Sequence, residues 1–356
     1  MNNRNLESVG CVVNNHNNKV VNNYDDLITL ENLFLSWKEF KKGKSKRKDV
    51  QEFEFNLEDN IFQLYYELKD KTYKHSNYSS FFIQDPKLRH IHKAKIKDRI
   101  VHHLIAKYLE SVFNKLFIFD SYFCRKNKGT HKAVNRLNCF CIKMSKNNKI
   151  NFYYLKCDIK KFFDNLDHNI LINILKRKIQ DKDILNLLKE IINSFYKGIP
   201  LGNLTSQWFA NIYLNELDRF IKHELKIKHY IRYTDDFVIL NKSKKDLEKL
   251  IPVIRKYLKT NLKLSLHPDK ITIRKYNQGI DFLGYVILPH YRILRTKTKK
   301  RIFKKIKLRI EEFKNNKIIE QSLNQSIQSY LGILKHCNGF KLRRELEDII
   351  KISKKC

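Results

Sequence analysis

The sequence predicts an α+β fold, in which strands and helices follow one another in mixed order rather than as a doubly wound parallel sheet. Residues 152–159 form a nearly continuous apolar run that ends in an acid, as expected of a strand buried on both faces. Two short apolar runs flank Thr234-Asp-Asp and predict a β-hairpin. Residues 100–116, by contrast, carry apolar side chains at helical spacing.

The remaining elements are predicted in the same way. Residues 170–195 show a helical pattern with polar gaps, and a turn at residues 198–202 precedes a further helical pattern. Residues 297–313 place isoleucines on one stripe and lysine or arginine almost everywhere else, which predicts an amphipathic helix with a basic outer face. The first 23 residues are rich in asparagine and are interpreted as a loose tail, and the basic stretch 41–48 as a solvated loop.

Composition points to a folded protein with a polyanionic partner. Apolar residues make up 42% and aromatic residues 12% of the 356 residues, which is ample material for a core. Lysine and arginine number 72 against 37 acidic residues, so the formal net charge is +35. Such a surplus favours nucleic acid as a partner, because phosphate contacts release bound counterions. A lysine-rich codon bias is an alternative source of charge, but it would also tend to raise the acidic residues.

Several protein classes are disfavoured by the sequence. The N-terminus lacks the apolar core of a secretory signal, and no run of about 18 apolar residues predicts a membrane span. The seven cysteines are scattered, and those at 139, 141 and 157 stand in apolar runs, so we expect reduced core residues of a cytoplasmic protein. No cysteine or histidine set has zinc-ligand spacing.

Paired carboxylates suggest chemistry at Asp235 and Asp236. Joining nucleotides is an in-line phosphoryl transfer that requires carboxylates to position two divalent cations. The dipeptide alone is weak support, because Asp25-Asp26 repeats it without apolar arms and is predicted to cap a helix N-terminus. The pair at Asp235 instead lies at the tip of the predicted hairpin, where two buried strands would present both acids together.

A third carboxylate, Asp158, ends the predicted strand at residues 152–159. A strand that ends in an acid and is followed by a tight turn can bind a metal and expose backbone N–H groups to a triphosphate. Phe163 is placed to lie under the incoming sugar, where an aromatic ring would clash with a 2′-hydroxyl, although a core position for Phe162 and Phe163 is an equal alternative. Asp164 and Asp167 are interpreted as helix-start acids and excluded from the site.

These motifs and several others occur in the order of the reverse-transcriptase motifs, and the chain resembles that family from about residue 80 onward. The resemblance rests on residues 97–103, 120–131, 158–163, 198–202 (GIPLG), 233–236 (YTDD), 267–270 (HPDK), 282–285 (FLGY) and 329–336. It implies a right-hand polymerase with fingers, a palm built on an antiparallel sheet with helices, and a short helical thumb. The expected division is an N-terminal extension (1–80), fingers and palm (81–290) and thumb (291–356).

The resemblance also implies a set of site residues. Asp158, Asp235 and Asp236 would hold two Mg²⁺ ions, for which Mn²⁺ can substitute, with Ile159 as a further ligand beside Asp158. Lys270 matches a lysine that protonates the departing pyrophosphate. The nucleotide-binding residues would be Arg99, Arg125, Phe163, Leu201 and Gly202, and the primer grip Phe282, Leu283 and Gly284. The basic helix at residues 297–313 would follow the duplex of template RNA and new DNA.

The turn at residues 198–207 departs from the usual reverse-transcriptase pattern. Leu201 stands in place of glutamine and Gln207 in place of proline, which is similar to the reverse transcriptases of diversity-generating retroelements. That likeness implies copying of a template-repeat RNA into cDNA with adenine-directed infidelity, with the help of a small basic accessory protein. Leucine at position 201 can only pack, whereas an amide could hydrogen-bond the nucleotide. A purely packing role for Leu201 is an equal alternative.

Two rival functions remain open at this stage. A retron-type, defence-type or group II intron-like polymerase would share the metal site but copy another RNA. The stretch after Tyr285 is 71 residues (356 − 285), which we expect to be too short for a thumb together with maturase and endonuclease modules. The alternative of another class is a catalytically silent RNA-binding protein on a polymerase scaffold, which would be expected to have lost metal carboxylates, and none is missing.

Overall fold

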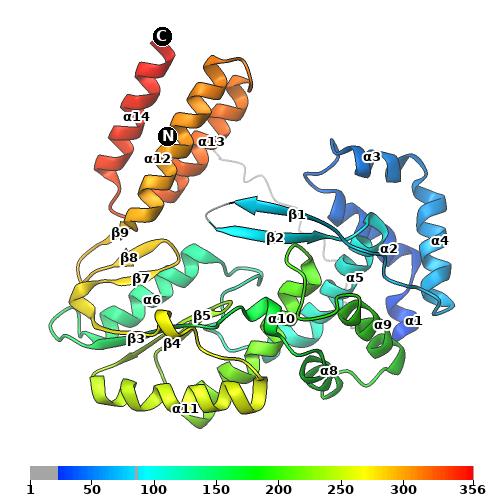
Figure 1. Cartoon of the computed structure of the whole chain (residues 1–356), viewed down its shortest axis with the longest axis horizontal. Coiled ribbons are helices and arrows are strands. Elements are labelled where there is room, and N and C mark those ends of the chain that lie inside the picture. Colours follow the sequence, from blue (N-terminus) through cyan, green and yellow to red (C-terminus); the bar gives the residue numbers. More distant parts are fainter. Residues whose placement is uncertain (1–22, 85–86, 356) are drawn as a thin grey trace, which may run out of the picture.

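The fold is described by a computed structural model that covers residues 23–84 and 87–355. The predicted N-terminal tail lies almost wholly outside the described residues. Strands and helices alternate in mixed order and every sheet is antiparallel, so the predicted α+β class is confirmed. Figure 1 shows the strands β3, β4 and β5 low in the molecule, helices α1–α4 to one side and helices α12–α14 above the other end.

A four-stranded sheet in the order β4-β5-β3-β6 carries Asp158 and Asp236 at the ends of two neighbouring strands. Its strands are β3 (Tyr153–Asp158), β4 (Tyr230–Tyr233), β5 (Asp236–Asn241) and β6 (Thr272–Lys275). One face packs on α10 (Leu204–Arg219) and α11 (Lys244–Leu262), and the other faces α6 (Thr130–Met144). Because both faces are covered, β3 is apolar along most of its length, as predicted.

Four helices precede the first strand: α1 (Tyr24–Leu27), α2 (Leu30–Lys41), α3 (Lys48–Phe55) and α4 (Leu57–Lys69). Helix α2 packs along α5 (Ile96–Phe113), and the two share one core with α10 and α11. A two-stranded ribbon, β1 (Ser79–Gln84) and β2 (Leu88–Lys93), lies between α4 and α5 in the chain. The predicted domain boundary at residue 80 falls within β1 and stays a prediction.

The predicted helix at residues 170–195 is in fact two helices, preceded by a single turn, α7 (Phe162–Asn165). They are α8 (His168–Lys176) and α9 (Lys182–Asn193). Asp181 causes the break, because its carboxylate accepts hydrogen bonds from the backbone N–H groups of Asp183 and Ile184 and so begins a new helix. The further helical pattern after residues 198–202 corresponds to α10, which a π-helical turn, η2 (Phe220–Glu224), extends.

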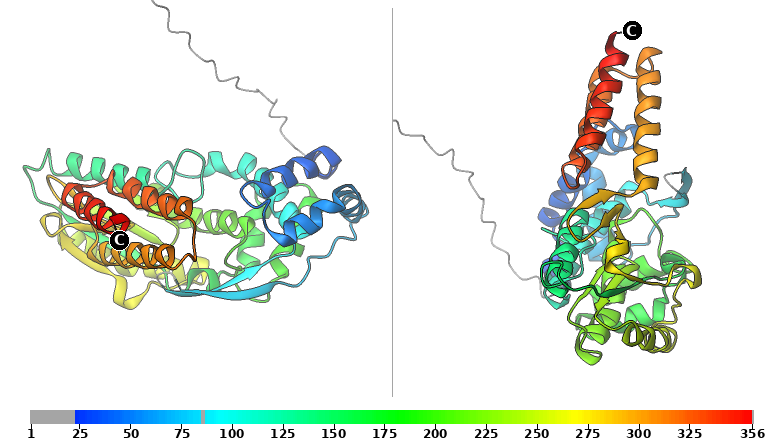
Figure 2. Two further views of the ribbon diagram at one scale, coloured as in Figure 1. Left: turned by 90° about the horizontal axis from the view of Figure 1, so that it is seen from above. Right: turned by 90° about the vertical axis from the view of Figure 1, so that its left-hand side faces the viewer.

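A three-stranded sheet connects the four-stranded sheet to three C-terminal helices. The sheet comprises β7 (Ile280–Phe282), β8 (Tyr285–Ile287) and β9 (Arg292–Leu294), and the helices are α12 (Thr296–Lys314), α13 (Glu320–Leu334) and α14 (Phe340–Lys355). Figure 2 shows these helices standing away from the rest of the fold. The stripe predicted for residues 297–313 is confirmed, because Ile302, Ile306 and Ile310 are buried.

The cysteines and the surface match the sequence expectations in most respects. Five cysteines lie within the described residues, and all five are free thiols. Cys141 and Cys157 are buried as expected, but Cys139 is exposed, because it lies on the outer side of α6. Among residues 23–84 and 87–355, none of the helices combines the length and apolar composition that crossing a membrane requires.

Candidate active site

Three carboxylates meet where β3 ends and the β4–β5 hairpin turns. Asp158 and Asp236 are direct partners in the β3–β5 register, so their side chains leave the sheet on the same face. Asp235 lies in the turn, next to Thr234, whose φ of 56° is in the left-handed region. The backbone N–H of Ile159 donates to the Asp235 carbonyl over 3.2 Å, which fixes the turn against the end of β3.

The end of β3 is anchored on its other side as well. The His267 N–H donates to the Asp158 carbonyl over 2.8 Å, and the Lys160 N–H donates to the Ser265 carbonyl over 2.9 Å. None of these bonds uses the carbonyl oxygen of Ile159, the group predicted as an additional metal ligand. The backbone carrying Asp158 is thus held by neighbours on both sides, as a rigid metal site requires.

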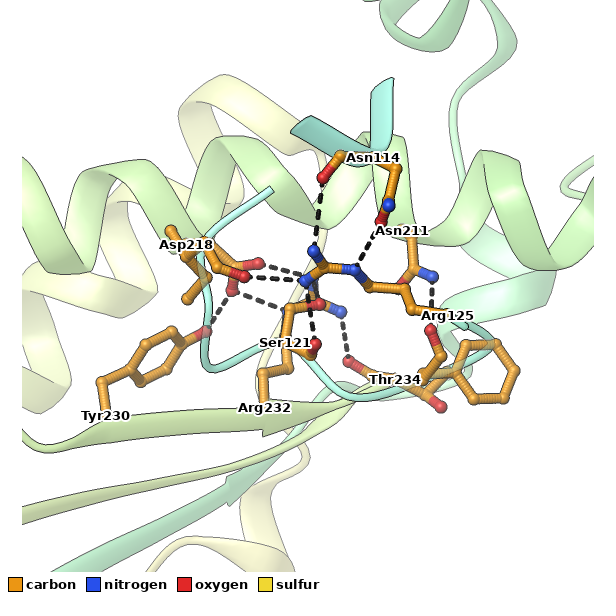
Figure 3. A network of polar contacts seen from close by, with 10 residues as sticks. Asn114, Ser121, Arg125, Asn211, Asp218, Tyr230, Arg232 and Thr234 are labelled. Atoms are coloured by element: carbon orange, nitrogen blue, oxygen red, sulfur yellow. Dashed lines mark hydrogen bonds and ion pairs between the residues drawn. The ribbon is translucent and has the colours of Figure 1, made fainter. Parts of the chain in front are cut away.

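A buried polar network supports the hairpin turn from behind (Figure 3). Arg232 in β4 is fully buried and forms a two-pronged ion pair with Asp218 of α10, with nitrogen–oxygen distances of 2.5 and 2.7 Å. A further guanidinium nitrogen donates to the Thr234 carbonyl over 3.0 Å. The Tyr230 hydroxyl donates to the same Asp218 carboxylate. Arg232 therefore joins the β4–β5 turn to the buried helix α10.

Two lysines neutralise two of the carboxylates. The ammonium of Lys270 lies 2.6 Å from Asp158 Oδ1, so the predicted proton donor does belong to this cluster. Lys156 Nζ lies 3.1 Å from Asp236 Oδ2 and donates to the Asp281 carbonyl over 2.7 Å. Within the described residues, no three histidine, cysteine, aspartate or glutamate side chains already form a converged metal site. In this arrangement the lysines supply the positive charge.

The electrostatic environment of Asp235 and Asp236 suits a bound cation. Burial, followed by the charge of Asp158, raises the pKa of Asp235. Burial raises the pKa of Asp236 to about 6, although the nearby ammonium of Lys156 opposes the rise. Asp236 Oδ1 is buried and has no hydrogen-bond partner among the described residues. Clustered carboxylates with an unpartnered oxygen are the hard ligands that Mg²⁺ prefers, so the residues present fit such an ion.

Three predicted nucleotide-binding residues lie along one connected segment. The Ile199 N–H donates to the Phe163 carbonyl over 2.8 Å, and Gly198 fits so closely there that a β-carbon would lie 2.2 Å from that oxygen. The Leu201 carbonyl accepts from the His92 N–H of β2 over 3.0 Å. Gly202 has a φ of 115° and touches β2 as well. The turn therefore links the segment after Asp158 to the β1–β2 ribbon.

The two predicted arginines lie elsewhere. Arg99 on α5 stacks over the Phe40 ring of α2, with 5.4 Å between the guanidinium carbon and the ring centroid. Arg125 donates four hydrogen bonds within its own loop, to the side chain and carbonyl of Asn114 and to the carbonyls of Ile118 and Ser121. The structure does not bring either guanidinium to the carboxylates, and Figure 3 shows Arg125 within the supporting network.

The predicted primer grip is the tight turn between β7 and β8. Phe282 pairs with Tyr285, so Leu283 and Gly284 form a two-residue turn, and both have positive φ values, 51° and 90°. Glycine accepts this conformation at no cost, but leucine rarely adopts it. The strained leucine is held in place by the short hairpin, and Phe282 is fully buried beneath it.

The acids excluded from the site are confirmed as helix-start residues. Asp167 caps α8, accepting a hydrogen bond from the Ile170 N–H over 3.0 Å. Asp164 lies in the first turn of α7. Asp25 and Asp26 occupy the first turn of α1, but the capping side chain there is Asn23, whose oxygen accepts from the Asp26 N–H. The helix N-cap predicted at Asp25-Asp26 therefore lies at Asn23, two residues before Asp25.

Sequence reasoning missed Lys156 and Arg232. Lys156 stands two residues before Asp158, and the two-residue period of a strand places both on one face, so a signal was present. Arg232 is a charged residue inside an apolar strand, which indicates a buried partner. Its partner Asp218 lies 14 residues earlier on a helix, and nothing in the sequence pattern identifies it.

Comparison with known proteins agrees with this geometry. Residues 74–287 match the family described as reverse transcriptase (RNA-dependent DNA polymerase). The chain is 24% identical to the group II intron-encoded protein LtrA of Lactococcus lactis, in an alignment of length 350 that covers 76% of this chain and 54% of LtrA. It is 26% identical to the retron Ec73 reverse transcriptase of Escherichia coli, with 54% of this chain and 64% of the relative covered.

Protein YkfC of Escherichia coli is 25% identical, over 57% of this chain and 64% of the relative. The chain thus spans less than two thirds of the length of each of these three relatives. The family match, in contrast, includes the carboxylate cluster, the turn at residues 198–202 and the predicted primer grip. Because that match covers more than half of the 356 residues, the chain belongs to the reverse transcriptase family of RNA-directed DNA polymerases.

Proposed function

We propose that this chain extends a DNA primer on an RNA template, with Asp158, Asp235 and Asp236 holding two Mg²⁺ ions. The observation that carries this proposal is the Asp158–Asp236 register pair with Asp235 at the adjoining turn. The Ile159 carbonyl is a further proposed ligand. Bound Mg²⁺ would supply the charge that activates the primer hydroxyl and stabilises the leaving pyrophosphate. The protein's own contribution is to hold the acids on rigid strands.

Lys270 has two roles in this proposal. Before metal and nucleotide bind, its ammonium neutralises Asp158 over 2.6 Å. When the carboxylate turns to a cation, Nζ is released and donates a proton to the departing pyrophosphate. Lys270 is partly exposed on a short 3-10 helix, so this movement needs no repacking of the core.

The nucleotide would lie between the segment at Phe163 and the turn at residues 201–202. Phe163 would lie under the sugar and exclude a 2′-hydroxyl. Arg99 and Arg125 would reach a triphosphate only by giving up their present contacts, with Phe40 and with the loop at residues 114–121. Substitution of either arginine is therefore expected to change folding stability as well as KM for the nucleotide. Leu283 and Gly284 would hold the primer end.

The test is primer extension on an RNA template with Mg²⁺, comparing wild type with an Asp235→Asn/Asp236→Asn variant. Loss of extension by at least about 10³-fold is expected, because the carboxylates provide the positioning of charge on which phosphoryl transfer depends. Equal extension by both proteins would refute the proposal, and no extension by either protein would favour the silent RNA-binding scaffold. A duplex-binding measurement on the same samples separates lost chemistry from lost binding.

We further propose that the template is a repeat RNA and that adenines in it are miscopied, as in diversity-generating retroelements. Leu201 and Gln207 support this, together with a small basic accessory protein as partner. Leu201 is half-buried, and its carbonyl is committed to β2, so only its apolar side chain would be available to a substrate. A site with no polar group to leave unpaired discriminates weakly between near-isosteres.

The infidelity is tested by Leu201→Gln, with product sequencing used to count errors opposite template adenine. Fewer such errors, with errors opposite other bases unchanged, are expected. An unchanged adenine error frequency would mean that leucine only packs the turn. A retron-type enzyme with another template is the second candidate, which the similarity to the retron Ec73 reverse transcriptase favours. Sequencing RNA that co-purifies with the protein separates the two, because only the first predicts a repeat shared with a target gene.

A further inference from the structure

We infer that Lys156 is a positioning residue that locks the catalytic carboxylate of Asp236 to the primer-grip strand. The inference rests on the proposed function above. Lys156 lies in the middle of the palm sheet, where its register partners are Val238 of β5 and Thr272 of β6. Its side chain is only 21% exposed, so its ammonium is fixed by its partners rather than by solvent.

The two contacts of Lys156 differ in kind. Its Nζ lies 3.1 Å from Asp236 Oδ2, an ionised acceptor, and 2.7 Å from the Asp281 carbonyl oxygen, a backbone acceptor of β7. Charge-assisted hydrogen bonds of this type are stronger and more restrictive than neutral ones. Holding Oδ2 leaves Oδ1, which is buried and unpartnered among the described residues, as the oxygen available to a cation.

The backbone contact extends the link to the primer grip and the thumb. Asp281 precedes Phe282, and its carboxylate forms an ion pair with Arg295, the residue before α12. The Arg295 N–H in turn donates to the Gly284 carbonyl over 2.9 Å. The ammonium of Lys156 therefore lies between Asp236, a proposed metal ligand, and the β7–β8 turn that would hold the primer end. A displacement of about 1 Å between these two parts is enough to slow a reaction roughly 10²-fold.

Lysine suits this position better than arginine. An ammonium is compact and has three donors, so it can serve a carboxylate and a carbonyl that lie on different strands. A guanidinium keeps the charge but is planar and larger, so its fixed fork is less suited to two acceptors that lie on different strands. Methionine keeps the length and apolar stem and removes both contacts, leaving Asp236 beside two other acids without its cation.

The experiment is pre-steady-state primer extension with the full chain and an excess of primer–template RNA, at saturating nucleotide and Mg²⁺. Lys156→Met is expected to lower the rate constant for nucleotide addition roughly 10²-fold, with burst amplitude and primer–template Kd unchanged within about twofold. Lys156→Arg is expected to recover part of that loss. Lys249→Met, which removes one exposed charge from α11, is the matched control and is expected to behave like wild type.

A merely structural role gives a different pattern. It would lower burst amplitude, the active fraction, while the molecules that remain folded react at the wild-type rate. That outcome, or a rate constant for Lys156→Met within about threefold of wild type, overturns the inference. If Lys156→Met does not fold, Lys156→Arg decides: a reduced rate at full amplitude supports positioning, and a wild-type rate refutes it. If Asp235→Asn/Asp236→Asn loses activity while Lys156→Met reacts at the wild-type rate, the positioning role of Lys156 is refuted and the proposed polymerase function still stands.

Discussion

At the scale of single residues, the buried pair of Arg232 and Asp218 determines whether the catalytic turn is held. Both side chains are fully buried, and the pair also satisfies the Tyr230 hydroxyl and the Thr234 carbonyl. Asp218→Asn keeps the shape but leaves the Arg232 charge uncompensated. We expect it to lower the free energy of unfolding by about 3–5 kcal/mol, measured by urea denaturation.

A double variant provides the control for this prediction. Replacing both partners by apolar residues, as in Asp218→Leu/Arg232→Met, removes the buried charge together with its counterion. We expect this variant to be more stable than Asp218→Asn yet still impaired in primer extension, because the Thr234 carbonyl loses its donor. A double variant as unstable as the single one would show that the turn, rather than the uncompensated charge, accounts for the loss.

Phe162 and Phe163 were equivalent in sequence but differ in the structure. Phe162 is 2% exposed and packs on Tyr213 in the core, whereas Phe163 is half-buried beside the turn at residues 198–202. Phe163→Ala is expected to raise ribonucleotide relative to deoxynucleotide incorporation by roughly 10–10²-fold, because the ring no longer excludes the 2′-hydroxyl. Competitive extension with both nucleotide types measures this ratio. Phe162→Leu is the control and should lower stability without changing the ratio.

Residue roles were predictable from sequence where spacing along one strand decides them. The placement of Asp158, Asp235 and Asp236 followed from one strand end and one hairpin, and the structure brings these residues together. The contact of Lys270 with Asp158 spans 112 residues, and only the motif order indicated it. Arg125 differs, because the four acceptors of its own loop compete successfully for its guanidinium. Such competition depends on backbone geometry that residue type alone does not specify.

At the scale of elements, a pair of histidines joins α5 to the segment before β1. His75 Nε2 and His102 Nε2 lie 3.1 Å apart, and the other ring nitrogen of His102 lies 3.4 Å from the Thr205 hydroxyl of α10. Burial, and then the charges of His75, His103 and Arg99, hold the pKa of His102 well below its usual value. His102 is therefore neutral in the folded protein.

This depressed pKa has a defined consequence for stability. A histidine whose folded pKa is lowered stabilises the fold above its unfolded value of about 6.5, and that contribution is lost as the pH falls below it. Between pH 7.5 and 5.0 the Tm of wild type is expected to fall, and the fall should be smaller in His102→Gln. The exposed His290→Gln is the control and should follow wild type. Parallel Tm curves for all three proteins would contradict the assignment.

Elements were predicted well where apolar periodicity was strong and uninterrupted. The helix at α5, the β4–β5 hairpin and α12 were found close to their observed positions, because burial on both faces makes the hairpin strands apolar, and apolar periodicity marks the two helices. The division of α8 from α9 was missed, since the cap at Asp181 interrupts a pattern that remains helical on both sides. The three-residue strands β7, β8 and β9 are too short to show a period, and tertiary pairing alone defines them.

At the scale of the whole molecule, the described residues form two hydrophobic cores. One joins helices α2 and α4 to α5, α8–α11 and one face of the palm sheet. The other joins the opposite face to α6, the β7–β9 sheet and the buried stripes of α12 and α13. The two faces of β3 thus connect both cores, and the acids at its end lie where they meet.

The net charge of +35 is the molecular property that most directly predicts behaviour in solution. Lys300, Lys304 and Lys307 are exposed on α12, on the side away from the buried stripe. Replacing all three by glutamine should weaken duplex binding and reduce the slope of log Kd against log salt by up to about 3, because each phosphate contact releases counterions.

The control variant removes the same charge from α11, which lies on the opposite side of the four-stranded sheet in Figure 1. It replaces three exposed lysines of that helix by glutamine: Lys245, Lys249 and Lys256. If the charge acts only through the overall field, both variants should change the slope equally. If α12 follows the duplex, as we predict, only the α12 variant should change the slope. Fluorescence anisotropy between roughly 50 and 300 mM salt distinguishes these two outcomes.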